Sequence, residues 1–470
     1  MKKSILNQYR FFDPDEKTRK SAYELYLKVK NLPIISPHGH VEAKLLAENR
    51  PFPDPTELLI IPDHYIYRML YSQGISLESL GIPTMDGTPV EKDHRKIWQI
   101  FGDNFHLFAG TPTGVWLRHE LVEVFGIEEK LNSKTAMKIY ERMVAKLKTK
   151  QFLPRTLFEK FNIEVLNTTD SPSDPLIYHK KIRESGWKKR IIPCFRPDAA
   201  VNIMSPKWKD EIGAISRISG IDIHDYRSFI KAFENRREYF KSFGGVSTDQ
   251  GVETPYAHRL TEGEADAIFQ RALKGQATDS DAAAFTANML MEMARMSVED
   301  GLVMQIHAGA MRNHNRKVFD RFGADKGGDI PVRAEYTRNM HEFLNEFGNN
   351  PKFTVVLFTL DETTYSRELA PIAGHYPAVK LGASWWFHDS IQGMTRYRQN
   401  ITETAGIYNT VGFTDDTRAF LSIPARHDLA RRMDSNFLAG LVARHIIDKD
   451  EARSLGKALA YDLAKKAYRL

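Results

Sequence analysis

The chain alternates short apolar segments with longer amphipathic ones along most of its length. Apolar, mostly β-branched runs that end in polar residues are Leu32–Ser36, Ile163–Asn167, Ile191–Phe195, Gly244–Ser247, Leu302–Ile306, Phe353–Phe358, Ala378–Leu381 and Thr410–Phe413. Helix-like stretches between them include Tyr226–Phe243, Asp279–Met296, Arg333–Phe347 and Arg367–Gly374. This alternation is typical of an α/β protein whose parallel sheet is covered by helices. Eight strands favour a closed (β/α)8 barrel of the TIM type over an open doubly wound sheet.

The first helix and strand illustrate the repeating unit. Asp13 is expected to cap a helix whose first turn holds Pro14 and Glu16. One face of that helix is apolar and consists of Ala22, Leu25, Tyr26 and Val29. The helix leads into the first strand, which ends in His-Gly-His. No GxGxxG motif follows any of the strands, which argues against a dinucleotide-binding fold.

The connection between the first and second strands is far too long for a single βα loop. It begins with a proline-rich stretch, Pro51 to Pro55, and contains amphipathic segments such as Ser133–Lys148. We therefore predict a mainly helical insertion domain at residues 44–159, beside a barrel formed by residues 1–43 and 160–470. The tail from about Arg426 is also predicted to be helical.

Composition narrows the class of protein further. Hydrophobic residues make up 42% and charged residues 27% of the 470, which is typical of a globular chain. No apolar run approaches the ~20 residues of a transmembrane helix. The start MKKSIL lacks an apolar signal-peptide core, and Cys194 is the only cysteine. These features predict a cytoplasmic protein without an internal disulfide and without a membrane partner.

The formal net charge of +6 is modest, and the basic residues are scattered among acidic ones. Nucleic-acid binding usually requires a concentrated basic face, so we do not expect a nucleic-acid partner. A mildly basic chain suits a small anionic substrate. Barrels of this size often form homo-oligomers, but the sequence shows no decisive interface signal.

The predicted strand ends carry polar side chains, as a site at the mouth of a barrel requires. They are His38-Gly-His40, Thr168-Thr169-Asp170, Arg196-Pro-Asp198, Thr248-Asp249, His307 with Arg312, Asp361, Trp385-Trp386, and Asp415-Asp416 with Arg418. His38 and His40 are two residues apart, so on an extended strand end they point to the same side. Two such imidazoles form half of a divalent-metal site, which His307 and Asp416 can complete.

Each of these residues also has a purely structural interpretation. A lone HxH can be a turn, and Asp415 can replace Asp416 as a ligand. Asp170, Asp198 and Asp249 can cap the helices that follow their strands, and Arg312 can pair with a neighbouring acid. Trp385 and Trp386 are adjacent, so on a strand they face opposite sides and only one borders the substrate. Without further information, His64 is a helix-terminal histidine and Tyr65 a half-buried aromatic.

Several motifs in order along the chain resemble the uronate (glucuronate) isomerase family of the amidohydrolase superfamily. They are SPHGHV, DHY at Asp63–Tyr65, WLRHEL, LNTTDSP, FRPD, HAGAMRN, SWWF, FTDDTRAFLS and RHDLARR. HxH alone indicates only the superfamily. The combination of DHY, the tandem tryptophan and Asp-x-Arg at the eighth strand indicates this one family.

The resemblance implies a single metal ion, zinc or else manganese or iron, bound by His38, His40, His307 and Asp416. It implies that His64 and Tyr65 reach the site from the first long connection. Arg196, Arg312 and Arg418 would surround a sugar acid, with Trp385, Trp386 and Asp170 beside it. The family interconverts D-glucuronate with D-fructuronate and D-galacturonate with D-tagaturonate. Where the family usually has Ser-Asp-His-Gly after strand four, this chain has Thr248-Asp249-Gln250-Gly251, and Gln250 cannot titrate near neutrality.

The isomerisation itself assigns roles to these residues. A carbonyl moves from C1 to C2 by loss of the C2 proton, formation of an enediol and protonation at C1. A carboxylate beside the metal is the expected base, which we assign to Asp416. Tyr65 with Arg418 is expected to move the hydroxyl protons, because a neighbouring guanidinium favours the phenolate. Arg196 or Arg312 is expected to hold the C6 carboxylate.

Two other functions are compatible with the same barrel. One is a metal-dependent hydrolase of an amide, lactone or ester. Such members often bridge two metals with a lysine at the end of strand four, where this chain reads Val-Ser-Thr-Asp-Gln. The other is a non-catalytic barrel that only binds a sugar acid. Such a barrel has no need of ionisable groups at almost every strand end.

Overall fold

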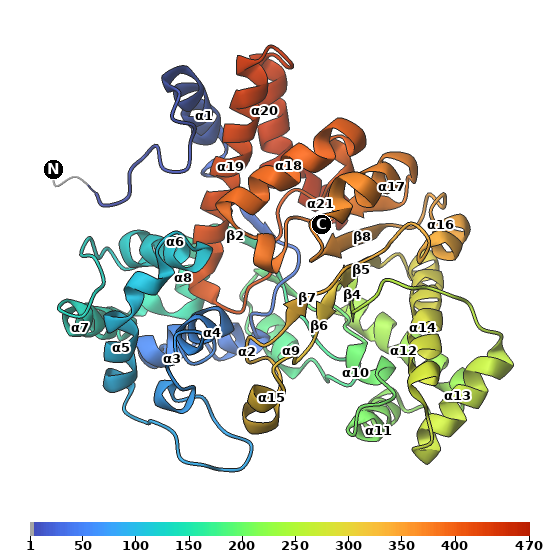
Figure 1. Cartoon of the computed structure of the whole chain (residues 1–470). Helices are drawn as coiled ribbons and strands as arrows, with labels where there is room; N and C mark the ends of the chain where they lie inside the picture. Colours follow the sequence, from blue (N-terminus) through green and yellow to red (C-terminus); the bar gives the residue numbers. More distant parts are fainter. Residues whose placement is uncertain (1–3) are drawn as a thin grey trace.

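The computed structural model describes residues 4–470, in which parallel strands and helices alternate. The first part of the sheet is formed by β1 (Ile34–Ser36), β2 (Ile163–Asn167) and β3 (Arg190–Ile192), in that order. The second part is formed by β4 (Ser247–Val252), β5 (Val303–Ala308), β8 (Val355–Thr359) and β9 (Val379–Leu381). All neighbouring strands in these two parts are parallel, as Figure 1 shows for the central strands. Residues 1–3 lie outside the described residues. They begin the stretch MKKSIL, in which the sequence shows no apolar signal-peptide core.

Single backbone pairings join the two parts into a barrel. Phe195, beyond β3, forms parallel bridges to Asp170 and to Thr248 of β4. At the other end, Leu381 of β9 forms a parallel bridge to Thr410. The N–H of His40 donates to the carbonyl of Thr417 at 3.0 Å, which brings the eighth segment back to the first. The strand order is therefore that of a closed (β/α)8 barrel.

Four predicted boundaries differ from the structure. Thr410–Phe413 is not a continuous strand, because Gly412 has φ +77° and only Thr410 pairs with a neighbour. Pro193 interrupts the third predicted strand, since proline has no N–H for the ladder. β4 begins at Ser247, so the polar residues expected after this strand lie within it. Of the predicted helix Arg333–Phe347, only α16 (His341–Phe347) forms.

The first helix, α1 (Glu16–Val29), buries the predicted face of Ala22, Leu25, Tyr26 and Val29. Its cap, however, is Asp15 rather than Asp13: the Asp15 carboxylate accepts the N–H of Thr18. The C-terminal region is helical, with α19 (Ile423–Ala443), α20 (Lys449–Lys457) and α21 (Leu463–Ala467). α1 packs against α19 and α20 (Figure 1).

The segment between β1 and β2 is helical. Its α-helices are α2 (Ala43–Glu48), α3 (Pro55–Leu59), α4 (His64–Tyr71), α5 (His94–Asp103), α6 (Pro112–His119), α7 (Ala136–Leu147) and α8 (Pro154–Lys160). The helices α3–α8, blue to cyan in Figure 1, gather on one side of the strands. Their buried residues share one hydrophobic cluster with Ile34, Ile163 and Leu166 of the barrel. The division into domains at residues 44 and 159 stays a prediction.

The longer helices that follow β3, β4 and β9 are α11 (Trp208–Ser219), α12 (Tyr226–Ser242), α13 (Glu262–Lys274), α14 (Asp279–Asp300) and α18 (Ile391–Ala405). α12 and α14 match two of the four predicted helices, those at Tyr226–Phe243 and Asp279–Met296. The N-terminal ends of α12 and α14 are stabilised by residues that are close in sequence. Asp225 and Thr278 each form a capping box with a residue three positions on, which satisfies free N–H groups of the first turn. No helix within residues 4–470 is long and apolar enough to cross a membrane.

Candidate active site at the mouth of the barrel

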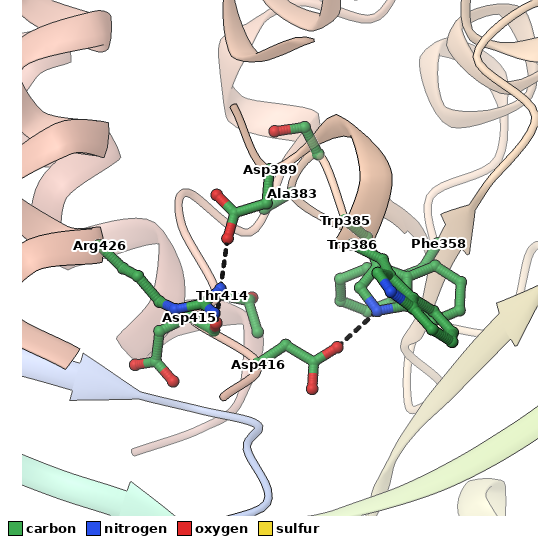
Figure 2. A pocket seen from close by; sticks show the side chains of 10 residues that line it. Phe358, Ala383, Trp385, Trp386, Asp389, Thr414, Asp415, Asp416 and Arg426 are labelled. Atoms are coloured by element: carbon green, nitrogen blue, oxygen red, sulfur yellow. Dashed lines mark hydrogen bonds and ion pairs between the residues drawn. The ribbon is translucent and has the colours of Figure 1, made fainter. Parts of the chain in front are cut away.

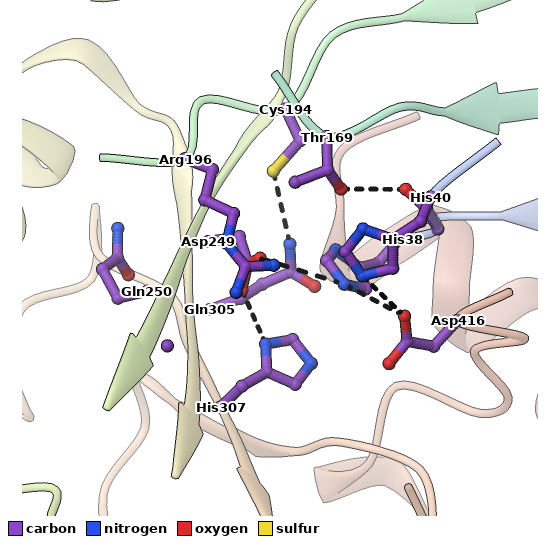
Figure 3. Close-up of polar contacts among 12 residues, drawn as sticks. His38, His40, Thr169, Cys194, Arg196, Asp249, Gln250, Gln305, His307 and Asp416 are labelled. Atoms are coloured by element: carbon purple, nitrogen blue, oxygen red, sulfur yellow. Dashed lines mark hydrogen bonds and ion pairs between the residues drawn. The ribbon is translucent and has the colours of Figure 1, made fainter. Parts of the chain in front are cut away.

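Three histidines and an aspartate meet where β1, β5 and the eighth segment end (Figure 3). One ligand atom from each of His38, His307 and Asp416 lies within 4.8 Å of the others. His40 joins this group through Asp416, whose Oδ1 lies 3.1 Å from His40 Nε2 and 3.5 Å from His38 Nε2. The structure thus brings together the four residues that the sequence predicted as a metal site.

The cluster is deeply buried and its hydrogen bonding is incomplete. The His38 side chain is 1% exposed and that of His307 4%. The buried His307 Nε2 makes no hydrogen bond within residues 4–470. Leaving such atoms without a partner is costly unless something else binds them. Neutral imidazole nitrogens and a carboxylate oxygen in one buried cluster are the donor set that a divalent transition metal prefers.

Asp249 of β4 contacts His307 and lies close to His38. From its position in the sequence, a helix-capping role was the structural alternative for this residue. Its side chain is fully buried, and its Oδ1 lies 2.6 Å from His307 Nδ1. Its Oδ2 lies 3.0 Å from Arg196 Nη1 and 3.9 Å from His38 Nε2. Burial alone would raise the pKa of Asp249, but Arg196 and the two histidines lower it, so it is ionised. The only sequence signal for this role was its position at the fourth predicted strand end.

Asp416 is ionised and held in one orientation. Burial alone would raise its pKa, but His38 and His40 lower it well below its usual range. Trp385 Nε1 donates a hydrogen bond to Asp416 Oδ2 (Figure 2). The backbone of Asp416 has φ +37°, a conformation that a residue with a Cβ adopts only at a cost. The neighbouring Asp415 is engaged elsewhere, with Ser36 Oγ at 3.0 Å and His427 Nε2 at 2.9 Å. Asp416, not Asp415, therefore meets the histidines.

The tandem tryptophans correct a prediction. They do not alternate across a strand, because β9 ends at Leu381 and Trp386 has φ +51° at the start of a 3-10 helix. Both rings therefore line the same pocket, together with Phe358, Asp389 and Asp416 (Figure 2). Trp385 lies edge-on to His307 with centroids 4.7 Å apart, whereas Trp386 stacks on His64 at 5.7 Å.

His64 and Tyr65 reach this region from the first turn of α4, which Asp63 caps. Burial, with help from nearby Arg418, lowers the pKa of His64 to about 3, so its imidazole is neutral. Burial raises the pKa of Tyr65, so at neutral pH it carries its proton. The guanidinium over the Tyr65 ring belongs to Arg426 at 5.6 Å, whereas Arg418 Nη2 pairs with Asp325 at 3.0 Å. The expected Tyr65–Arg418 pairing is thus replaced by two other pairings.

The other predicted substrate residues lie around the cluster with partners of their own. Arg196 Nε pairs with Asp198 at 2.9 Å in addition to Asp249. Arg312 pairs with Asp329 at 2.7 Å and lies over the Trp386 ring at 5.3 Å. Asp170 accepts a hydrogen bond from Thr168 Oγ1 at 2.6 Å, and burial raises its pKa to about 7.

Gln250 replaces the family's usual histidine without entering the cluster. Its Nε2 donates to Thr248 Oγ1 at 2.9 Å along the same strand. Its Oε1 is buried and has no partner within residues 4–470. The cluster of His38, His307 and Asp416 forms without this side chain.

A second buried network lies behind Asp416, and the sequence patterns did not predict it. Arg426 of α19 donates from Nη1 to Asp389 Oδ2 at 2.6 Å and to the Asp415 carbonyl at 3.2 Å. Its guanidinium stacks 3.6 Å from the Trp116 ring centroid. A run of Arg-His-Asp within a predicted helix was the available signal, because such residues are rarely buried together unless they are paired.

Comparison with known proteins identifies the family of the chain. The sequence model for glucuronate isomerase matches residues 10–468. The chain belongs to the glucuronate isomerase family. Members of this family are isomerases, and the chain is an enzyme of that class. A uronate isomerase of Nostoc punctiforme is 53% identical over 470 residues, which is 100% of this chain and 99% of the relative.

Solved structures of glucuronate and uronate isomerases have the same fold. The crystal structure of glucuronate isomerase from Caulobacter crescentus superimposes with a TM-score of 0.97 at 50% identity, covering 99% of this chain and 97% of that one. A uronate isomerase from Thermotoga maritima gives 0.92 at 30% identity, covering 99% and 100%. The fold and the family resemblance predicted from the sequence are therefore confirmed.

Proposed function

We propose that the chain interconverts aldo- and keto-uronates, D-glucuronate with D-fructuronate and D-galacturonate with D-tagaturonate. The observation that carries this proposal is the buried His38–His307–Asp416 cluster, with His40 beside it, in a member of an isomerase family. The reaction moves a proton between C2 and C1 and needs no second substrate. A buried carboxylate at the end of the eighth segment is a suitable carrier of that proton.

His38, His40, His307 and Asp416 would hold one divalent metal ion, zinc by the chemistry of the donor set and otherwise manganese or iron. The unpartnered His307 Nε2 supports this assignment, as does the position of Asp416 Oδ1 between the imidazoles of His38 and His40. When bound, such an ion supplies a positive charge that polarises the carbonyl and stabilises an adjacent oxyanion. Asp249 would fix the ring of His307 through Nδ1 and leave Nε2 free for the metal.

Asp416 is the base in this proposal. Its carboxylate takes the proton from C2 of the aldose, which leaves an enediol, and returns the proton to C1 to give the ketose. The indole of Trp385 holds Asp416 Oδ2, so the carboxylate keeps one orientation during both transfers. The proton on O2 must also move to O1. At neutral pH the phenol of Tyr65 carries its proton and can donate it to one of these oxygens, whereas the neutral imidazole of His64 has a free nitrogen that can accept from the other.

Basic residues around the cluster suit the acid end of the sugar. A guanidinium binds a carboxylate with two parallel hydrogen bonds. Arg196 pairs with Asp249 beside the clustered histidines, Arg312 lies over the Trp386 ring, and Arg418 pairs with Asp325. Trp385 and Trp386 would border the carbon chain, and Asp170 would accept a hydroxyl hydrogen bond at the edge.

The test is direct. Metal-loaded protein is incubated with D-glucuronate, and separately with D-galacturonate, in deuterated water, and the sugars are followed by proton NMR. We expect the matching ketouronate. Deuterium at its C1 would show that the proton exchanged with solvent during the transfer.

Paired carboxylate variants test the base. We expect Asp416→Asn to lower kcat by about 10²–10⁴-fold. The control is Asp361→Asn, two residues after β8, where the carboxylate accepts the N–H of Thr363 in its own loop and the N–H of Ala334 in the segment after β7, and accepts from none of the four clustered residues. We expect this control to keep its activity. Full turnover by metal-loaded Asp416→Asn would place the base elsewhere, and no turnover of either sugar by the loaded wild type would refute the proposed substrates.

A further inference from the structure

A long excursion crosses from the barrel to the helical segment beside the site. It comprises residues 312–329, between the short antiparallel strands β6 (Ala310–Met311) and β7 (Ile330–Pro331), which follow β5. It contains α15 (Arg316–Phe322), drawn in gold in Figure 1. We call residues 312–329 the β6–β7 excursion.

The excursion is docked on the helical segment at several points. Val318 and Phe322 join the hydrophobic cluster of that segment. The N–H of Met85 donates to the carbonyl of Arg321 at 2.7 Å. The hydroxyl of Tyr67, on α4, donates to the carbonyl of Asp325 at 2.8 Å.

The backbone next to Asp325 lies directly against α4. Gly327 has φ +73°, and a Cβ added there would lie 2.6 Å from Arg68 Cβ. Only glycine therefore fits this approach. Asp325 itself has φ +59°. Residues 325–327 of the excursion are therefore held against α4.

The docked excursion places the carboxylate of Asp325 against Arg418. Asp325 Oδ2 accepts a hydrogen bond from Arg418 Nη2 at 3.0 Å. Arg418 Nε and Nη1 make no hydrogen bond to any residue of the 4–470 range, so they stay available for a sugar oxygen. Burial alone would raise the pKa of Asp325, but the Arg418 guanidinium lowers it below its usual value, so the pair is ionic.

We propose that Asp325 is a positioning residue for the isomerisation: it holds the Arg418 guanidinium at the rim of the site through Nη2, so that Nε and Nη1 can bind the sugar acid. This inference rests on the role given to Arg418 under the proposed function. Arg418 follows Asp416 by two residues, and its side chain is 44% exposed. An exposed arginine without a partner samples many rotamers, and ordering it during the reaction is costly.

The expected effect is modest because the pair is half exposed. Ion pairs of this kind contribute at most about 1 kcal/mol, which corresponds to about a fivefold effect. We expect Asp325→Asn to lower kcat about two- to fivefold and to leave KM within about twofold. Tyr67→Phe, which removes only the hydroxyl that holds the Asp325 carbonyl, should lower kcat in the same direction by a smaller factor.

A matched control is available on the same excursion. Asp320 pairs with Arg316 Nε at 2.8 Å on α15, and both side chains are exposed. Asp320→Asn removes an equivalent ion pair away from the site and should leave kcat unchanged. The melting temperature of each variant, measured in parallel, reports any loss of folded protein.

The decisive measurement is a double-mutant cycle with Arg418→Lys, assayed with D-glucuronate on metal-loaded protein. If Asp325 acts through Arg418, Asp325→Asn should have no further effect in the Arg418→Lys background. An equal effect in both backgrounds would overturn the inference. So would a fall in KM at constant kcat, which would mean that Asp325 competes with the sugar acid for Arg418. Unchanged kcat in Arg418→Lys alone would refute the role of Arg418 and this inference with it.

Discussion

Asp249 is the residue through which the proposed metal site can be tested most sharply. It is fully buried, and its two oxygens contact His307 Nδ1 at 2.6 Å and Arg196 Nη1 at 3.0 Å. In Asp249→Asn, one of these two donors would face the amide NH2 instead of an acceptor. His307 would lose the charge that fixes its ring. We therefore expect weaker metal binding in a protein that still folds.

The magnitude follows from these contacts. Loss of a group that orients a metal-binding histidine costs about 10- to 100-fold in metal affinity, or about 1.4–2.7 kcal/mol. Removing one partner of a buried ion pair costs about 3–5 kcal/mol of folding stability. Here the cost should be near the lower end, because Arg196 keeps Asp198 at 2.9 Å and is 24% exposed.

The assay is a competition for zinc between the metal-free protein and a chromophoric chelator, with urea unfolding of the same samples. The control is Asp198→Asn, because Asp198 contacts Arg196 and the N–H of Gly251 but neither histidine. We expect the control to bind zinc with wild-type affinity. A zinc affinity of folded Asp249→Asn within twofold of the wild type would refute the orientation of His307 by Asp249.

Three further predictions concern the metal, the indole beside the base and a buried carboxyl. Exhaustive chelation should abolish isomerisation, and added zinc, manganese or iron should restore it; activity that survives removal of all bound metal, measured by elemental analysis, would exclude a metal role. Trp385→Phe removes the hydrogen bond to Asp416 Oδ2 and should lower kcat about tenfold. The control is Trp98→Phe, which loses a hydrogen bond to the backbone carbonyl of Ala136 in the helical segment and should lower the melting temperature but not kcat. Burial raises the pKa of Glu120 from 4.5 to about 8, so the stability that its protonated form contributes is fully present below pH 4.5 and lost as pH rises through 8. Glu120→Gln should therefore raise the melting temperature more at pH 9 than at pH 6. An equal change at both pH values would contradict the raised pKa.

The sequence by itself determined the kind of barrel and most of the metal cluster. Eight apolar runs that alternate with helices favour a (β/α)8 barrel, in which the C-terminal ends of all strands share one mouth. His38, His40 and His307 could therefore be placed together from their positions at the predicted strand ends alone. Local signals also positioned α12 and α14, because apolar periodicity and capping residues act within a few residues along the chain.

Tertiary structure decided which partner each polar side chain meets. Asp249 had the pattern of a possible helix cap, yet it is buried in β4 between Arg196, which lies beyond β3, and His307 of β5. The choice between Asp415 and Asp416 depended on Ser36 and His427, which are distant in sequence.

Backbone conformation likewise depended on the fold. The left-handed turn at Trp386 places both tryptophans in one pocket, which no alternation rule predicts. A residue adopts such a conformation only when the surrounding structure compensates for its cost. Sequence patterns reveal the faces of helices and strands, whereas the pairing of buried charges depends on neighbours that only the folded chain brings together.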